Sequence, residues 1–99
     1  MYGLITKISA QPGKREALVD VLIDGSRGMA GCVAYVVAAD LTDEHAVWIT
    51  ELWDERQSHQ ASLSLQSVKD AIAKGRPLIA GFALRAETTP APRSVSRAR

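Results

Sequence analysis

The chain has 99 residues, of which 46% are hydrophobic, and its formal net charge is +1. This length predicts a single domain, and the nearly balanced charge argues against a protein that binds nucleic acid or a membrane surface mainly by electrostatics. A domain of this size buries only about 60–65% of the surface of its unfolded chain, so the many apolar residues favour a subunit interface.

Three absences narrow the class of protein. Cys32 is the only cysteine, which excludes an intrachain disulfide and a thiolate metal cluster and fits a reducing compartment. No apolar run approaches the roughly 18 residues of a membrane-spanning helix. Residues 1–16 lack the pattern of a signal peptide. We therefore expect a cytoplasmic protein without a metal site.

The first half of the chain alternates between strand and helix patterns. Residues 2–9 are β-branched and alternating, which predicts a strand. Apolar residues then recur with helical spacing over residues 14–25, which end in a Gly-containing segment. Residues 32–39 predict a strand that is apolar on both faces, and residues 45–53 predict another. The short turn between these two strands favours an antiparallel hairpin.

The second half begins with a helical segment over residues 55–75, which the sequence suggests is broken near residues 64–67. A fourth strand is expected over residues 80–87. The remaining residues, 88–99, contain two prolines and three arginines but no apolar cluster. They predict a disordered basic tail that follows a single domain of residues 1–87.

The predicted order of elements is β-α-β-β-α-β, an α+β pattern typical of a ferredoxin-like fold. In this fold an antiparallel sheet carries both helices on one face. The strand at residues 32–39 is nevertheless apolar on both faces. We therefore expect a second copy of the chain to cover the other face of the sheet, which predicts a homodimer.

Several short motifs occur in a characteristic order along the chain. Residues 11–14 (QPGK) precede the first helix, residues 31–35 (GCVAY) open the second strand, and residues 51–53 (ELW) end the third. His59 follows on the next helix. Together these motifs resemble the antibiotic biosynthesis monooxygenase family of small dimeric α+β barrel proteins, over about residues 1–86.

This resemblance implies a homodimer in which each subunit holds a cavity between its sheet and its helices. It implies that the protein oxidises a small phenolic or quinol-type aromatic with O2, without flavin, haem or metal. It implies no nucleic acid partner and no membrane partner. Some relatives degrade haem with a histidine later in the second helix, but this sequence has no histidine after His59.

Two residues are candidates for catalysis. His59 matches the family's histidine, and its ordinary pKa near about 6.5 suits a general base. The alternative is a surface or interface histidine that bonds to the backbone. Glu51 lies in an apolar strand, where a carboxylate is costly to bury unless it is paired. It could orient His59 or contact the substrate. The alternative, which the sequence favours, is a structural ion pair with Arg56, Arg76 or a group of a partner chain.

Four aromatic residues are candidates for substrate binding. Alternation along the third strand places Trp48 and Trp53 on opposite faces, so one could line the cavity while the other packs at the dimer interface. Tyr35 could donate a hydrogen bond to a substrate oxygen, and Phe82 could form a further wall. For each of them, ordinary core packing is the alternative.

A non-catalytic protein remains a second hypothesis. The same fold can bind a small molecule or serve only for assembly, and the motifs above include structural residues. The first strand, residues 2–9, also lacks the Asn that some active family members carry there. His45, beside an acidic turn, is expected to be solvated, and Cys32 is expected to be a small buried side chain with an unactivated thiol.

Overall fold

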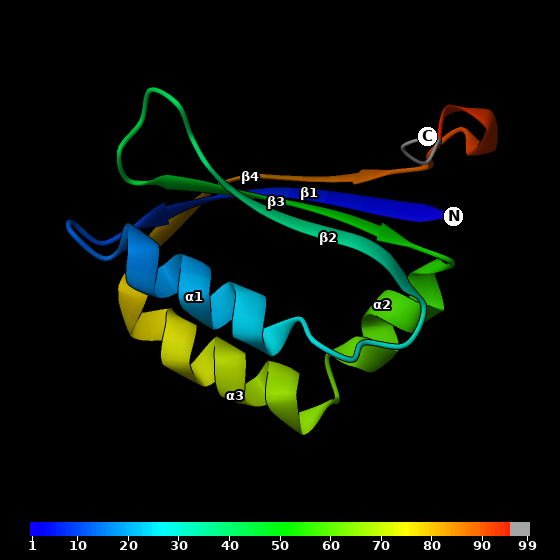
Figure 1. Ribbon diagram of the computed structural model, residues 1–99, viewed down its shortest axis with the longest axis horizontal. Coiled ribbons are helices and arrows are strands. Elements are labelled where there is room, and N and C mark those ends of the chain that lie inside the picture. Colours follow the sequence, from blue (N-terminus) through cyan, green and yellow to red (C-terminus); the bar gives the residue numbers. More distant parts are fainter. Residues whose placement is uncertain (96–99) are drawn as a thin grey trace.

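The computed structural model describes residues 1–95 and shows one four-stranded sheet with helices on a single face (Figure 1). This confirms the α+β, ferredoxin-like prediction. The elements in chain order are β1 (Tyr2–Ala10), α1 (Arg15–Gly25), β2 (Cys32–Ala39), β3 (Ala46–Trp53), α2 (Arg56–Ser62), α3 (Gln66–Gly75), the 3-10 turn η1 (Arg76–Leu78), β4 (Ile79–Thr88) and the 3-10 turn η2 (Pro92–Ser94).

The strands lie in the order β2-β3-β1-β4, and each neighbouring pair is antiparallel. The hairpin expected between the second and third strands is therefore present. Helices α1 and α3 run side by side beneath the sheet, and α2 lies near the end of the sheet where β1 begins (Figure 1). Because β1 and β3 are the inner strands, their side chains form most of the surface that the helices cover.

The long helical segment expected in the second half is two helices. The helix α2 ends at Ser62, and α3 starts at Gln66 after Leu65 adopts an extended conformation. The Ser62 hydroxyl donates a hydrogen bond of 2.6 Å to the carbonyl oxygen of His59, the kind of local bond that competes with helix continuation. The break leaves His59 on a short helix of its own, at one end of the sheet.

The side chains between sheet and helices form two clusters. The larger cluster lies around Ile8, Leu18 and Val47, at the end of the sheet where β1 finishes. The smaller consists of Tyr2, Leu4 and Trp53, at the end where β1 starts. Both clusters lie on the helix-covered face, because these strand residues share one side of the pleat.

The opposite face of the sheet carries no α-helix in residues 1–95, and the short 3-10 turn η2 follows beyond the end of β4 (Figure 1). Val36 on β2 is 53% exposed there and Leu84 on β4 is 42% exposed. Leu84 lies opposite Lys7 on β1, whose ammonium group stands 5.3 Å from the centre of the Trp48 ring. The face is thus a mixed but largely apolar surface without a cover from this chain.

The last strand continues to Thr88, one residue beyond the predicted domain boundary. Thr88 and Pro90 lie directly against Gly3, where any side chain would collide with them. The tail predicted to be disordered, residues 88–99, falls partly outside the described residues, which end at Val95. None of the helices in residues 1–95 is long and apolar enough to span a membrane.

Gly31 allows the start of β2 to approach α2 closely, so its replacement should destabilise the fold. Gly31 has φ +82°, and a Cβ there would lie 2.6 Å from the side chains of Asp54 and Ser58. Gly28 has φ +69° but open space around it. We predict that Gly28→Ala costs about 1–2 kcal/mol from backbone strain, and that Gly31→Ala costs about 1–3 kcal/mol more from overpacking.

Urea unfolding of both variants measures the difference. Equal losses would show that the close approach at Gly31 contributes nothing beyond its backbone conformation.

Candidate active site

A cavity of about 620 Å³ lies between the sheet and the helices. Most of its wall is apolar and includes Leu18 and Leu22 of α1, Ile72 of α3 and Phe82 of β4. Its volume falls within the range of roughly 300–1,000 Å³ that is typical of small-molecule sites. The cavity is therefore large enough for an aromatic molecule of two or three rings.

Two polar residues of the cavity wall, Tyr35 and Glu51, lie in one row across the sheet. Tyr35 on β2 is the register partner of Glu51 on β3, and Glu51 is the partner of Leu4 on β1. Leu4 is in turn the partner of Glu87 on β4. Directly opposed residues share a face of the sheet, so all four side chains point toward the helices. Tyr35 and Glu51 line the cavity.

Glu51 is a buried carboxyl group held by one aromatic donor. Its residue is 9% exposed, and its Oε1 atom accepts a hydrogen bond of 3.1 Å from Nε1 of Trp53. Burial raises its pKa, although the Trp53 hydrogen bond and the charge of Arg85 act in the opposite direction. Among residues 1–95 Glu51 forms no ion pair. The pair favoured from the sequence, with Arg56 or Arg76, is therefore not formed.

His59 reaches the same end of the cavity from α2. Its imidazole lies against two aromatic rings, with centroids 5.6 Å from Tyr2 and 5.5 Å from Trp53. Burial lowers the pKa of His59 below its ordinary 6.5, and the nearby charge of Arg85 lowers it further. At neutral pH the ring is therefore mostly uncharged and can accept a proton.

Tyr35 complements this base with a proton donor. Burial raises the pKa of its phenol above the ordinary 10.0, and the neighbouring Glu51 adds to the effect. The hydroxyl group therefore keeps its proton throughout the physiological range. A phenol that stays protonated can donate a hydrogen bond to an oxyanion in the cavity.

The structure brings four of the six predicted site residues onto the cavity wall. These four residues are Tyr35, Glu51, His59 and Phe82. Phe82 is 68% exposed. It is the register partner of Ile8, whereas Glu51 is the partner of Leu4, so the two wall residues lie at different distances along β1.

The two tryptophans have different positions. Trp53 is fully buried and contacts the His59 ring at an interplanar angle of 70°, and it is not part of the cavity wall. Trp48 lies on the opposite face, where its Nε1 donates a hydrogen bond of 2.7 Å to Oδ1 of Asp40. Trp48 therefore does not line this cavity, because strand alternation turns it away from the helices.

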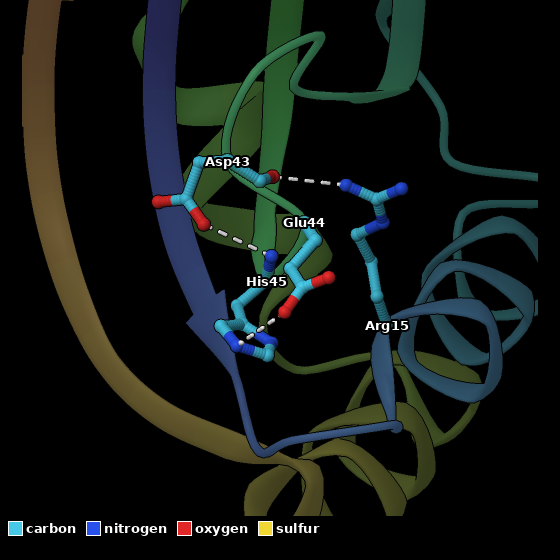
Figure 2. A network of polar contacts seen from close by, with 4 residues as sticks. All are labelled: Arg15, Asp43, Glu44 and His45. Carbon is cyan, nitrogen blue, oxygen red and sulfur yellow. Dashed lines mark hydrogen bonds and ion pairs between the residues drawn. The ribbon is translucent and has the colours of Figure 1, made fainter.

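The second histidine does not line the cavity and lies at the opposite end of β3 from Trp53. His45 follows the β2–β3 turn, and its Nε2 lies 3.4 Å from Oε1 of Glu44 (Figure 2). The Asp43 carbonyl in the same turn accepts a hydrogen bond of 3.0 Å from Arg15 of α1. His45 thus belongs to a polar network that fastens the turn to α1.

Sequence patterns did not single out a polar cluster behind His59. The Tyr2 hydroxyl donates a hydrogen bond of 2.8 Å to Oε2 of Glu87. Arg56 and Arg85 reach the same carboxylate at 3.3 and 3.8 Å. The pairing of β1 with β4 brings Tyr2 to Glu87 and Arg85, and α2 adds Arg56; the sequence carries no signal for that register.

The described residues offer no ready metal site. No group of three or more His, Cys, Asp or Glu side chains within residues 1–95 is arranged to hold an ion. Cys32 is half-buried, and burial raises the pKa of its thiol. A thiol with a raised pKa is a poor nucleophile and a poor metal ligand at neutral pH.

Comparison with known proteins identifies the family of this chain. The family model for antibiotic biosynthesis monooxygenase matches residues 1–74. The chain therefore belongs to the antibiotic biosynthesis monooxygenase family. No curated protein matched the sequence.

Solved structures extend the likeness over nearly the whole chain. A candidate antibiotic biosynthesis monooxygenase from Chloroflexus aurantiacus is 57% identical, with a TM-score of 0.90, and the match covers 91% of this chain and 92% of that one. Another candidate from Deinococcus radiodurans is 24% identical, with a TM-score of 0.78 and coverage of 92% and 93%. A conserved protein from Methanosarcina mazei has a TM-score of 0.77 at 16% identity, covering 88% and 89%. The last two comparisons support the fold alone.

The raised pKa of Glu51 makes a prediction about stability. The folded protein holds this proton more tightly than the unfolded chain, so the free energy of unfolding should fall as pH rises above the ordinary value of 4.5. Gln at this position keeps an acceptor for Trp53 but cannot ionise. We therefore expect Glu51→Gln to gain stability relative to the natural protein between pH 4 and pH 8.

Urea unfolding at both pH values tests this expectation, with Glu16→Gln on the exposed surface of α1 as the control. A stability difference between Glu51→Gln and the natural protein that stays constant with pH would contradict it.

Proposed function

We propose that this protein is a cofactor-independent monooxygenase that oxidises a small phenolic or quinol-type aromatic with molecular oxygen. The observation that carries the proposal is the combination, at one end of an apolar cavity, of an uncharged imidazole, a protonated phenol and a buried carboxyl group. Membership of the antibiotic biosynthesis monooxygenase family supports the reaction class.

The chemistry needs no group beyond the substrate and O2. A phenolate is electron-rich enough to give one electron to O2, and the resulting radicals combine to form a carbon–oxygen bond. Cleavage of the O–O bond then releases water and leaves a carbonyl group. A phenol with a free para position becomes a para-quinone: four electrons leave the ring, one oxygen atom enters the product, and the other enters water.

Each residue has a distinct part in this proposal. His59 removes the phenolic proton and returns a proton to the departing oxygen, as a general base and then a general acid. Tyr35 donates a hydrogen bond to the phenolate oxygen and so stabilises its charge. Glu51 lies beside Tyr35 and holds Trp53, which supports the His59 ring. The apolar wall excludes water from the radical intermediates.

We also propose that the protein works as a cytoplasmic homodimer. The uncovered face of the sheet exposes Val36 and Leu84 and carries Trp48 beside Lys7. A second copy packed sheet to sheet would bury this apolar surface, and exposed apolar patches of this kind often mark protein–protein contacts. Trp48 would then contribute to the interface and not to the substrate cavity.

A non-catalytic binding protein is the second candidate, because the cavity would hold an aromatic ligand without any reaction. The cavity wall alone supports this function. Oxygen consumption separates the two candidates.

Oxygen uptake by the metal-free protein, with a panel of hydroquinones and polycyclic phenols, tests the activity. We predict turnover above the autoxidation blank and a loss of at least about tenfold in His59→Ala, since a general base typically contributes 10²–10⁴-fold. The control is His45→Ala, which removes the histidine outside the cavity. No uptake with any substrate would favour the binding protein, and equal losses in both variants would exclude His59 as a specific base.

The pH dependence of turnover makes a separate prediction. His59 acts in its uncharged form, and its pKa is lowered by burial and by Arg85. The acid limb of kcat should therefore have its midpoint below pH 6.5. A midpoint above that value would mean that another group limits the reaction.

Light scattering after size-exclusion chromatography tests the dimer. We predict that Val36→Asp, on the uncovered sheet face, gives monomers at micromolar concentration because it would bury an unpaired charge. Ile23→Asp, on an α1 residue that is 42% exposed, should leave the dimer intact. A natural protein that is monomeric would overturn this part of the proposal.

A further inference from the structure

Two pairs of an acid and an aromatic residue lie next to the His59 ring. Trp53 contacts the ring and donates its indole hydrogen to Glu51. Tyr2 also contacts it, with ring planes inclined by 35°, and donates its hydroxyl hydrogen to Glu87. Each aromatic residue is therefore held at its polar end by a carboxyl group while its ring contacts the imidazole.

The sheet register produces this arrangement. Tyr2 and Trp53 are directly opposed on β1 and β3, so their rings emerge side by side under α2. Glu51 and Glu87 stand one row further along, on either side of Leu4. Neither aromatic ring can turn without losing its hydrogen bond, and Trp53 is fully buried as well. The imidazole thus rests against two surfaces that are themselves fixed.

We propose that Tyr2 is a positioning residue, which holds the His59 imidazole against Trp53 through the hydrogen bond from its own hydroxyl to Glu87. This inference rests on the proposed function, in which His59 is the base. A base must keep its nitrogen within hydrogen-bond reach of the substrate proton, and small errors of placement cost rate. The short helix α2 alone would leave the ring free to change rotamer toward the cavity.

The charges around the ring are compatible with this role. Glu87 forms ion pairs with Arg56 at 3.3 Å and Arg85 at 3.8 Å, so its negative charge is more than balanced. The groups that face His59 are Tyr2 on β1, Trp53 with Glu51 on β3, Arg85 and Glu87 on β4, and Arg56 on its own helix. The Glu87 carboxylate can therefore orient Tyr2 without keeping the His59 ring in its charged form.

Two conservative substitutions separate orientation from charge. Tyr2→Phe keeps the ring but removes the hydroxyl, so it releases the ring from Glu87. Glu87→Gln keeps an oxygen that can accept the Tyr2 hydrogen bond but removes the charge. If Tyr2 holds the His59 ring in place, Tyr2→Phe should increase the motion of that ring. The second should leave the ring in place and lower the pKa of His59, because it removes a carboxylate and leaves both arginines.

The experiment combines NMR of the histidine rings with steady-state kinetics. His45, outside the cavity, is the internal control for ring order and pKa, because the chain has only two histidines. For Tyr2→Phe we expect increased motion of the His59 ring, unchanged His45 signals, and a fall in kcat of about tenfold with KM changed less than twofold. For Glu87→Gln we expect an ordered His59 ring and a lowered His59 pKa.

Each outcome decides the proposal. A His59 ring that stays ordered in Tyr2→Phe overturns it, whatever the activity, and so does a loosened ring with an unchanged kcat. If Tyr2→Phe is too unstable to study, Glu87→Ala removes the same hydrogen bond while retaining Tyr2, and the same two results decide. If the natural protein oxidises nothing, the proposed function fails, but the NMR result still shows whether Tyr2 holds the imidazole.

Discussion

The antiparallel pairing of β1 with both β3 and β4 is the constraint on which the site depends. It places Leu4 between two carboxyl groups, with Glu51 on one side and Glu87 on the other. Glu51 is thereby buried beside the cavity, whereas Glu87 reaches the sheet edge, where arginines meet it. A slip of one residue would turn every one of these side chains to the uncovered face.

The helices cover only one face of the sheet. Both the proposed active site and the proposed dimer interface follow from this arrangement. On the covered face, the break between α2 and α3 brings His59 over the end of the sheet and leaves a cavity beside it. Burial there favours the uncharged forms of His59, Glu51 and Tyr35, so the site is set for proton transfer and not for binding ions. The other face keeps an exposed apolar surface, which a second copy would cover in the proposed dimer.

Much of the fold follows from the sequence, because alternation and helical spacing report which side of an element is apolar. They also place Trp48 and Trp53 on opposite faces and predict a break in the second helical segment, as the structure has it. The register of the strands and their long-range partners produce no such pattern in the sequence. The pairing of Tyr2 with Glu87 depends on how strands distant in the chain align, so Tyr2 was overlooked. Trp53 and Glu51 are two residues apart on the same face of β3, but alternation alone does not show that they bond to each other, and an ion pair was expected for Glu51.

Isotope labelling of the product tests the central claim of cofactor-free monooxygenation most directly. The metal-free protein is incubated with a phenol that it turns over, under ¹⁸O2 in ordinary water, and the product is analysed by mass spectrometry before its carbonyl oxygens exchange. The account predicts one ¹⁸O atom per product molecule and one in the water formed. A product without ¹⁸O, whose new oxygen atom then comes from water, would contradict it.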